Sequence, residues 1–170
     1  MRGERLKDFK QLYKLYSKPL YNYLLYLTND RSLAEELVQE TFYQVIISIH
    51  RFKGRSTIKT WVYQIGKNVY YKHLKKNAMN NGEFDENDVK FADFSTPENI
   101  WEKEERESVL HLAIQQLKEP YKQVVILRSF NELSFKEIGN ILEGSENWAR
   151  VTFHRGKLRL REILKKEEFN

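Results

Sequence analysis

The chain contains no cysteine, which excludes disulfide bridges, thiolate metal sites and cysteine nucleophiles. This absence fits a reducing compartment. No apolar run approaches the roughly 20 residues needed to cross a bilayer. The charged N-terminus is not followed by an apolar segment of the kind found in signal peptides. We therefore expect a soluble cytoplasmic protein.

Signatures of catalysis are also missing. The seven glycines form no phosphate-binding loop. Three glutamates (35, 36 and 40) cluster on one segment, but no histidine accompanies them. The four histidines, which show no metal-ligand spacing, are His50, His73, His111 and His154. We therefore expect no enzyme, no metal and no cofactor.

What the chain has is charge, divided unevenly along its length. Its 170 residues, 41% of them hydrophobic, allow one domain or two small ones. Residues 1–77 carry 15 basic and 6 acidic side chains, a net charge of +9. Residues 78–100 carry −5 and residues 101–170 carry +1. The basic block indicates a polyanionic partner, with a membrane surface as the competing target.

Hydrophobic periodicity predicts helices throughout, and therefore an all-α fold of two small helical domains joined by an acidic linker. The N-terminal domain, residues 1–77, is expected to hold four helices, with Pro19 starting the second and Ser32 capping the third in a capping box with Glu35. Residues 78–97 lack periodicity and are predicted to be the linker. Its phenylalanines at 84, 91 and 94 are candidates for docking on a partner.

The third and fourth helices flank a basic loop, residues 51–56. On the fourth helix, Ile58, Trp61, Val62, Ile65 and Val69 form an apolar stripe. Tyrosines and lysines are predicted to be exposed on the opposite face, which holds Thr60, Tyr63, Gln64, Lys67, Tyr70 and Tyr71. Such a face suits stacking on unpaired bases while cations follow the phosphates. A surface covered by a partner protein is the alternative.

The C-terminal domain, residues 98–170, is predicted to begin with a helix whose inward residues are Ile100, Val109, Leu112, Ala113 and Leu117. Asn131 suits a left-handed helix C-cap, and Ser134 with Glu137 forms a second capping box. Residues 134–161 then have the spacing of a helix-turn-helix whose second helix places side chains outward that can read base edges: Asn147, Arg150, His154, Arg155 and Arg161. A three-helix packing unit with a solvated basic face is the alternative.

These motifs resemble region two and region four of the extracytoplasmic-function (ECF) sigma factors of bacterial RNA polymerase. The resemblance covers nearly the whole chain. It rests on RSLAEELVQETF at residues 31–42, TWVYQIGKN at 60–68, LKEP at 117–120 and LSFKEIG at 133–139. It implies a promoter-specificity subunit that binds core polymerase, melts the minus-ten element and recognises the minus-thirty-five element.

The resemblance also implies roles for individual residues. Docking on the β′ clamp helices of polymerase would use Asp30, Glu36, Leu37, Gln39 and Glu40. Minus-ten recognition, with a flipped base held by the loop, would use Phe52, Lys53, Gly54, Arg55, Ser56, Thr60, Tyr63, Gln64, Lys67, Asn68, Tyr71 and Lys75. Minus-thirty-five recognition would use Ser145, Asn147, Arg150, His154 and Arg155.

Further partners follow from the same resemblance: the β flap of polymerase and a separate anti-sigma protein, which in this family often sits in the membrane. The chain departs from the family in the WAR sequence at residues 148–150, where the recognition helix commonly has a Thr-Val-Lys type sequence. No further C-terminal sensor domain is expected. From the residues alone, a dimeric helix-turn-helix repressor or activator and an RNA-binding module remain alternatives to a monomeric sigma factor.

Overall fold

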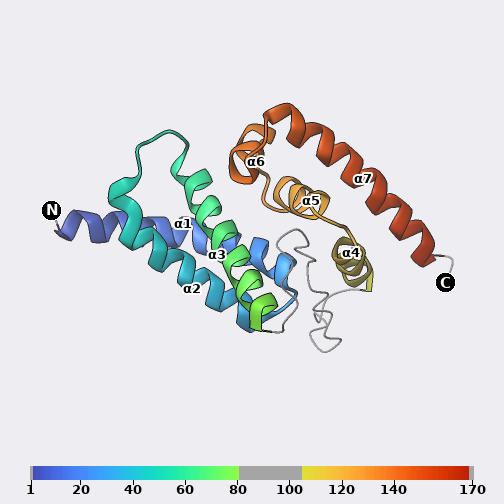
Figure 1. Ribbon diagram of the computed structural model, residues 1–170, viewed down its shortest axis with the longest axis horizontal. Coiled ribbons are helices and arrows are strands. Elements are labelled where there is room, and N and C mark those ends of the chain that lie inside the picture. Colours follow the sequence, from blue (N-terminus) through green and yellow to red (C-terminus); the bar gives the residue numbers. More distant parts are fainter. Residues whose placement is uncertain (1, 81–104, 169–170) are drawn as a thin grey trace.

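The computed structural model describes residues 2–80 and 105–168, and side chains within 8–80 and 109–166. In these residues the fold is helical with no strand, which confirms the all-α prediction (Figure 1). The elements are α1 (Arg2–Thr28), α2 (Arg31–Ser48), the short 3₁₀ helix η1 (Ile49–Arg51), α3 (Ile58–Asn80), α4 (Glu105–Gln115), α5 (Tyr121–Ser129), α6 (Phe135–Leu142) and α7 (Glu146–Glu168). We call α1–α3 the N-terminal half and α4–α7 the C-terminal half.

The N-terminal half has three α-helices, so the prediction of four was wrong. Helix α1 continues through Pro19 instead of restarting there. Proline removes one backbone hydrogen bond from a helix interior and normally kinks or breaks it. Here Leu20, Tyr23 and Leu24, which follow directly, are completely buried. Their packing against α2 and α3 stabilises the continuous helix against the local preference of proline.

Two predicted helix caps are replaced by neighbouring residues. Asp30, rather than Ser32, is the N-cap of α2, and its side chain accepts a hydrogen bond from the backbone amide of Leu33 at 3.0 Å. After α5 the left-handed residue is Glu132 (φ 55°), not Asn131. The predicted capping box of Ser134 and Glu137 is confirmed, with both reciprocal hydrogen bonds present at the start of α6.

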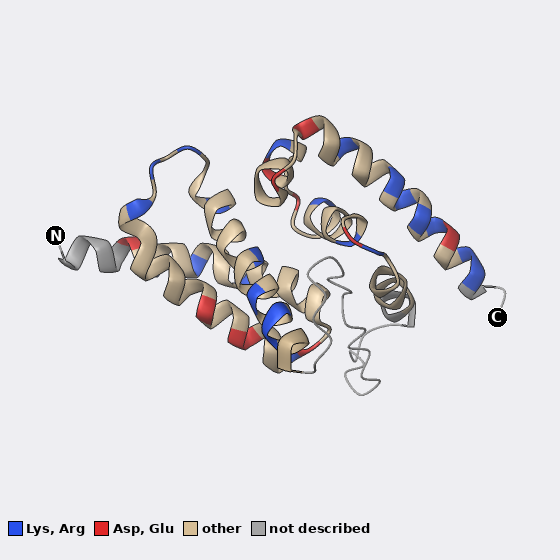
Figure 2. Cartoon of the chain, in the orientation of Figure 1, with Lys and Arg blue, Asp and Glu red and all other residues tan. Residues whose placement is uncertain are grey.

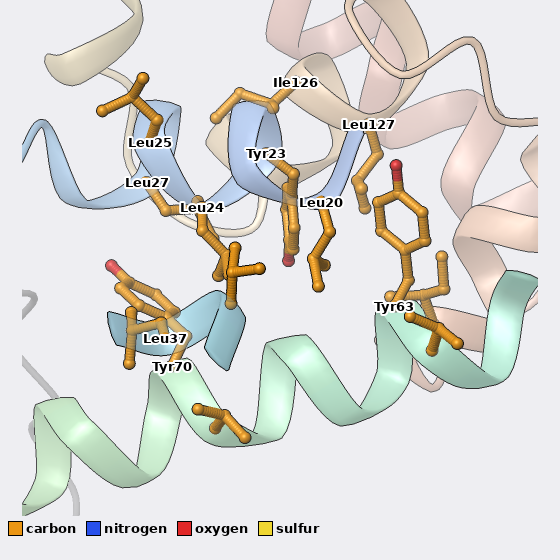
Figure 3. Close-up of a cluster of buried hydrophobic side chains, with 14 of the residues drawn as sticks. Leu20, Tyr23, Leu24, Leu25, Leu27, Leu37, Tyr63, Tyr70, Ile126 and Leu127 are labelled. Carbon is orange, nitrogen blue, oxygen red and sulfur yellow. The ribbon is translucent and has the colours of Figure 1, made fainter. Parts of the chain in front are cut away.

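The two halves share one hydrophobic core. Within each half the helices pack on one another, and α3 also packs on α6 while α1 contacts α4 and α5. Figure 3 shows Leu20 and Tyr23 of α1 close to Ile126 and Leu127 of α5, with Tyr63 of α3 beside them. The rings of Tyr26 and Phe130 add a stacked pair with centroids 4.4 Å apart. The C-terminal half therefore lies directly on α1 and α3.

The predicted acidic linker lies almost wholly outside the described residues, as do its phenylalanines at 84, 91 and 94. Helix α3 continues to Asn80, three residues into the range assigned to this linker. On α4 the inward prediction was wrong for Val109 and Leu112, which are 37% and 58% exposed. The core positions of this segment are Ala113, Ile114 and Leu117.

Candidate nucleic-acid interface

The loop between α2 and α3 forms a hollow with basic and aromatic walls. Gly54 lies in the loop with φ 67°, a conformation that glycine adopts without strain. Phe52 packs against Trp61 of α3 with ring centroids 5.2 Å apart. The resulting loop hollow has a volume of about 440 Å³ and is lined by Arg51, Phe52, Lys53, Arg55, Ser56, Trp61, Gln64 and Asn140. Cations next to aromatic rings are suited to a nucleotide's phosphate and base.

The helix that follows does not expose the face predicted to bind DNA. Tyr63 is completely buried, Thr60 is 1% exposed, Tyr70 5% and Lys67 7%. The prediction of an exposed tyrosine and lysine surface was therefore wrong. Periodicity correctly separated two faces of α3, but both are covered, one by α2 and the other by α1 and the C-terminal half.

The minus-ten candidates thus separate into different places. Phe52, Lys53, Arg55, Ser56 and Gln64 line the loop hollow. Tyr63 and Tyr71 instead bond to the C-terminal half, as described below. Asn68 is exposed on the side of α3 that faces α2, and Lys75 is exposed near the end of the helix. The structure therefore brings only the loop candidates and Gln64 together.

The buried tyrosines act as neutral hydrogen-bonding groups. The Tyr63 hydroxyl accepts a hydrogen bond from Asn131 Nδ2 at 2.9 Å, and the Tyr71 hydroxyl accepts one from Gln123 Nε2. Burial and, to a smaller extent, the nearby Glu119 carboxylate raise the pKa of Tyr71 to about 12. Burial also raises the pKa of Tyr63. Both hydroxyls therefore remain protonated at physiological pH.

The helix-turn-helix is formed by α6, a tight turn and α7. A Cβ built on Gly139 would lie 2.8 Å from the carbonyl oxygen of Gly144, so only glycine permits this approach of helix and turn. Trp148 packs over Gly144, whose own built Cβ would collide with the indole ring. The departure from the family pattern at residues 148–150 is thus accommodated by a small residue in the turn.

The predicted minus-thirty-five residues lie just before α7 and within its first ten residues. Asn147, Arg150, His154 and Arg155 are exposed, and Figure 2 shows basic residues along the length of the helix. Arg150 Nη2 is 2.9 Å from Glu146 Oε1, and its guanidinium lies 5.4 Å from the centroid of the Phe135 ring. The hydroxyl of Ser145 caps the helix by accepting a hydrogen bond from the amide of Trp148.

The candidate polymerase-binding residues lie on α2 beside a groove. Glu36, Gln39 and Glu40 are exposed, whereas Leu37 is only 3% exposed: it packs in the core and contributes to the wall of the groove. Asp30 caps the helix. We call the cavity of about 760 Å³ between α2 and α3 the α2–α3 groove; its α3 wall includes Asn68, Lys72, His73 and Lys76. Acidic residues on one helix thus face basic residues on the other (Figure 2).

Three residues that line the loop hollow were not among the predicted minus-ten residues: Arg51, Trp61 and Asn140. Trp61 was assigned to the apolar stripe, although its ring also forms the wall against Phe52. Asn140 reaches the hollow from α6, where its carbonyl oxygen accepts a hydrogen bond from Gln64 Nε2 at 2.7 Å. These partners are 76 positions apart, and no local pattern marks such a contact.

No three histidine, aspartate or glutamate side chains of residues 2–80 and 105–168 gather in a way that could hold a metal ion. In the same part of the chain, none of the helices is long and apolar enough to cross a membrane.

Both halves of the chain match models of known protein families. The family model of Sigma-70 region 2 matches residues 12–79, and that of Sigma-70, region 4 matches residues 108–160. The sigma factor RpoE from Bartonella quintana, solved in complex with the anti-sigma factor NepR, has the same fold. It superposes with a TM-score of 0.75 at 23% identity and covers 94% of this chain and 98% of RpoE.

Relatives with known names cover nearly the whole chain. RNA polymerase sigma factor YlaC of Bacillus subtilis is 29% identical over 161 residues, which are 94% of this chain and 93% of YlaC. ECF RNA polymerase sigma factor SigX of the same organism is 30% identical over 170 residues, covering 95% of this chain and 87% of SigX. The chain belongs to the ECF family of RNA polymerase sigma factors, which direct transcription initiation.

Proposed function

We propose that this sigma factor captures the unpaired minus-ten strand in the loop hollow and reads the minus-thirty-five duplex with α7. The observation that carries the first half is the hollow itself, where Phe52 and Trp61 stand among Arg51, Lys53 and Arg55. Aromatic faces stack on any base, and the surrounding cations offset phosphate charge. Unpairing a base costs a few kcal/mol, a cost that such contacts offset.

For the minus-thirty-five element, the start of α7 enters the major groove. Asn147 and Arg150 are exposed there, and their side chains can form paired hydrogen bonds to adenine and guanine edges. Glu146 and the Phe135 ring hold the Arg150 guanidinium on the outer face of the helix. A guanidinium held in this way loses less conformational entropy when it binds a base.

Core polymerase binds along α2 in this proposal. Glu36, Gln39 and Glu40 form an exposed acidic and polar row beside the α2–α3 groove. Such a row suits the β′ clamp helices, and the β flap is the expected contact of the C-terminal half. An anti-sigma protein is the third partner, since the similar sigma factor RpoE was solved in complex with the anti-sigma factor NepR.

In this proposal the protein catalyses no reaction itself, and it is a monomer when it is not bound to polymerase. A stand-alone repressor or activator is not favoured, because such a protein has no need for a basic aromatic hollow on a second domain. A cytoplasmic location follows from its work on promoter DNA, with an anti-sigma partner able to hold it at the membrane.

Run-off transcription from a promoter-fragment library tests the proposal. Core RNA polymerase is assayed alone, with the wild-type protein and with Arg55→Ala, using Lys10→Ala on exposed α1 surface as the matched control. We expect starts that require the protein and share two motifs at a fixed spacing. Arg55→Ala is expected to reduce open complexes, detected by permanganate reactivity of minus-ten thymines, while Lys10→Ala is not. Absence of protein-dependent starts with active core would contradict the proposal.

A further inference from the structure

The α3 face that sequence predicts for the minus-ten strand is covered by the C-terminal half. Tyr63 bonds to Asn131, two residues beyond the end of α5, and Tyr71 bonds to α5 itself. Lys67 lies one turn from each tyrosine and is 7% exposed. A side chain buried in this way cannot stack on a base. In this arrangement the part of α3 around Tyr63 and Lys67 is closed to DNA, whereas the loop hollow stays open.

Two amide side chains of the C-terminal half each connect α1 with α3. Gln123 of α5 is 1% exposed; its Oε1 accepts a hydrogen bond from the hydroxyl of Tyr23, and its Nε2 donates one to the hydroxyl of Tyr71. Asn131 Nδ2 donates to the carbonyl oxygen of Pro19 and to the hydroxyl of Tyr63, both at 2.9 Å. Each amide thus fixes both helices at once.

The same contact also contains polar atoms that are left without a partner. Among the side chains that the structure describes, two buried oxygens accept no hydrogen bond, Asn131 Oδ1 and Glu119 Oε1. Glu119 precedes α5 and lies near Tyr70 and Tyr71 of α3. Buried polar atoms without partners are rare and costly. Opening the contact would hydrate both oxygens, which makes this interface easier to separate than a fully satisfied core.

The contact ends at the mouth of the loop hollow. Gln64 of α3 donates to the carbonyl oxygen of Asn140 at 2.7 Å, and Lys59 lies 4.0 Å from Glu137 of α6. The C-terminal half therefore occupies the path by which a strand leaving the hollow would follow α3. DNA and the C-terminal half compete for one face.

We propose that Gln123 and Asn131 form a latch that holds the C-terminal half over α3 in the free protein, so that this interface opens before the minus-ten strand is captured along α3. This inference rests on the proposed function in one respect, the identification of the bound strand as minus-ten DNA. The intramolecular contact itself can be measured without DNA or polymerase. The competing outcome is that the C-terminal half stays packed on α3 permanently and the interface never opens.

A pair of introduced cysteines tests whether α3 and α6 are in contact in the free protein, and whether this contact prevents DNA binding. Because the chain has no cysteine, Lys59→Cys with Glu137→Cys introduces the only two thiols. A short bismaleimide then joins α3 to α6 in the full-length protein. The control is the same double variant blocked with N-ethylmaleimide, which shares any loss from the α6 capping box. We expect cross-linking in the free protein, and a lower rate when Gln123→Ala or Asn131→Ala is added, but not with Asn22→Ala, an exposed amide on α1.

Binding of a fluorescent single-stranded oligonucleotide with the minus-ten non-template sequence gives the second readout. Without Asn131, the carbonyl oxygen of Pro19 and the hydroxyl of Tyr63 lose a hydrogen-bond partner only in the closed state, which destabilises that state. We therefore expect the latch variants to bind the oligonucleotide at least roughly tenfold more tightly than the wild-type protein does. The cross-linked protein should lose most of its binding relative to the blocked control. Equal binding by cross-linked and blocked protein would overturn the latch, even if the alanine variants fold poorly. Failure of the proposed function shows separately, as absence of protein-dependent transcripts.

Discussion

Glu119 is expected to make the stability of the protein fall as pH rises. Its Oε1 is shielded from solvent, although the residue as a whole is only partly buried. Burial raises the pKa of this carboxyl from 4.5 to about 7, against opposing effects of Lys122 and the hydrogen bonds from Gln123. The titratable groups of α1 and α3 near it are hydroxyls, on Tyr23, Tyr70 and Tyr71.

The direction follows from proton counts. Between pH 4.5 and about 7 the folded protein keeps the Glu119 proton while the unfolded chain loses it. The contribution of Glu119 to stability is therefore greatest below its pKa in the unfolded chain. It declines as the pH rises through its pKa in the folded protein. The full difference corresponds to roughly 3 kcal/mol of unfolding free energy, of which about 2.5 kcal/mol falls between pH 5 and pH 8.

Urea unfolding of wild type and Glu119→Gln, followed by helical circular dichroism at pH 5, 6, 7 and 8, measures this effect. We expect the difference in unfolding free energy to move in favour of the glutamine variant by about 2.5 kcal/mol across this range. Glu162→Gln, at an exposed glutamate of α7, is the matched control and should follow wild type. Parallel pH profiles for wild type and Glu119→Gln would refute the argument, because they would mean that the carboxyl titrates alike in both states.

Three substitutions test other elements. Arg150→Ala should cost roughly 1–3 kcal/mol at one position of the minus-thirty-five element in holoenzyme binding; equal weakening on every sequence would instead indicate a phosphate contact. Gly139→Ala should lower unfolding free energy by roughly 1–3 kcal/mol, because its Cβ would lie 2.8 Å from the carbonyl oxygen of Gly144. Lys136→Ala, at an exposed position on the same helix, should not do so. Asp30→Ala should cost about 1 kcal/mol of stability through the α2 cap, seen as a lower melting temperature; an unchanged temperature would deny it that role.

Local signals in the sequence predicted what local physics decides. The Ser134 and Glu137 capping box formed as expected because both hydrogen bonds join residues three positions apart. The all-α class and the helix-turn-helix spacing follow from the same short-range patterns. Pro19 shows where such rules end. Its preference for a first turn was overridden because burial of the next turn of α1 stabilises one continuous helix.

The candidate site was predicted in part for the same reason. The basic loop and exposed α7 residues could be identified because little else packs on them. Burial of Tyr63 and Tyr71 depends on Asn131 and Gln123, which are 68 and 52 positions away. Periodicity assigns residues to faces of a helix but says nothing about what covers each face. That information lies in long-range contacts.

The chemistry of tyrosine explains why this one misassignment is informative. An apolar ring with a hydroxyl tip can stack on a base, and it can equally pack into a protein interface if the hydroxyl finds a partner. Tyr63 and Tyr71 find such partners in Asn131 and Gln123. A face that must be hidden in one state and bind DNA in another requires side chains that are stable in both surroundings. Leucine would satisfy only the first state. The same tyrosines therefore explain both the sequence pattern typical of strand binding and the burial seen in the structure. In the proposed latch, DNA and the C-terminal half compete for these side chains.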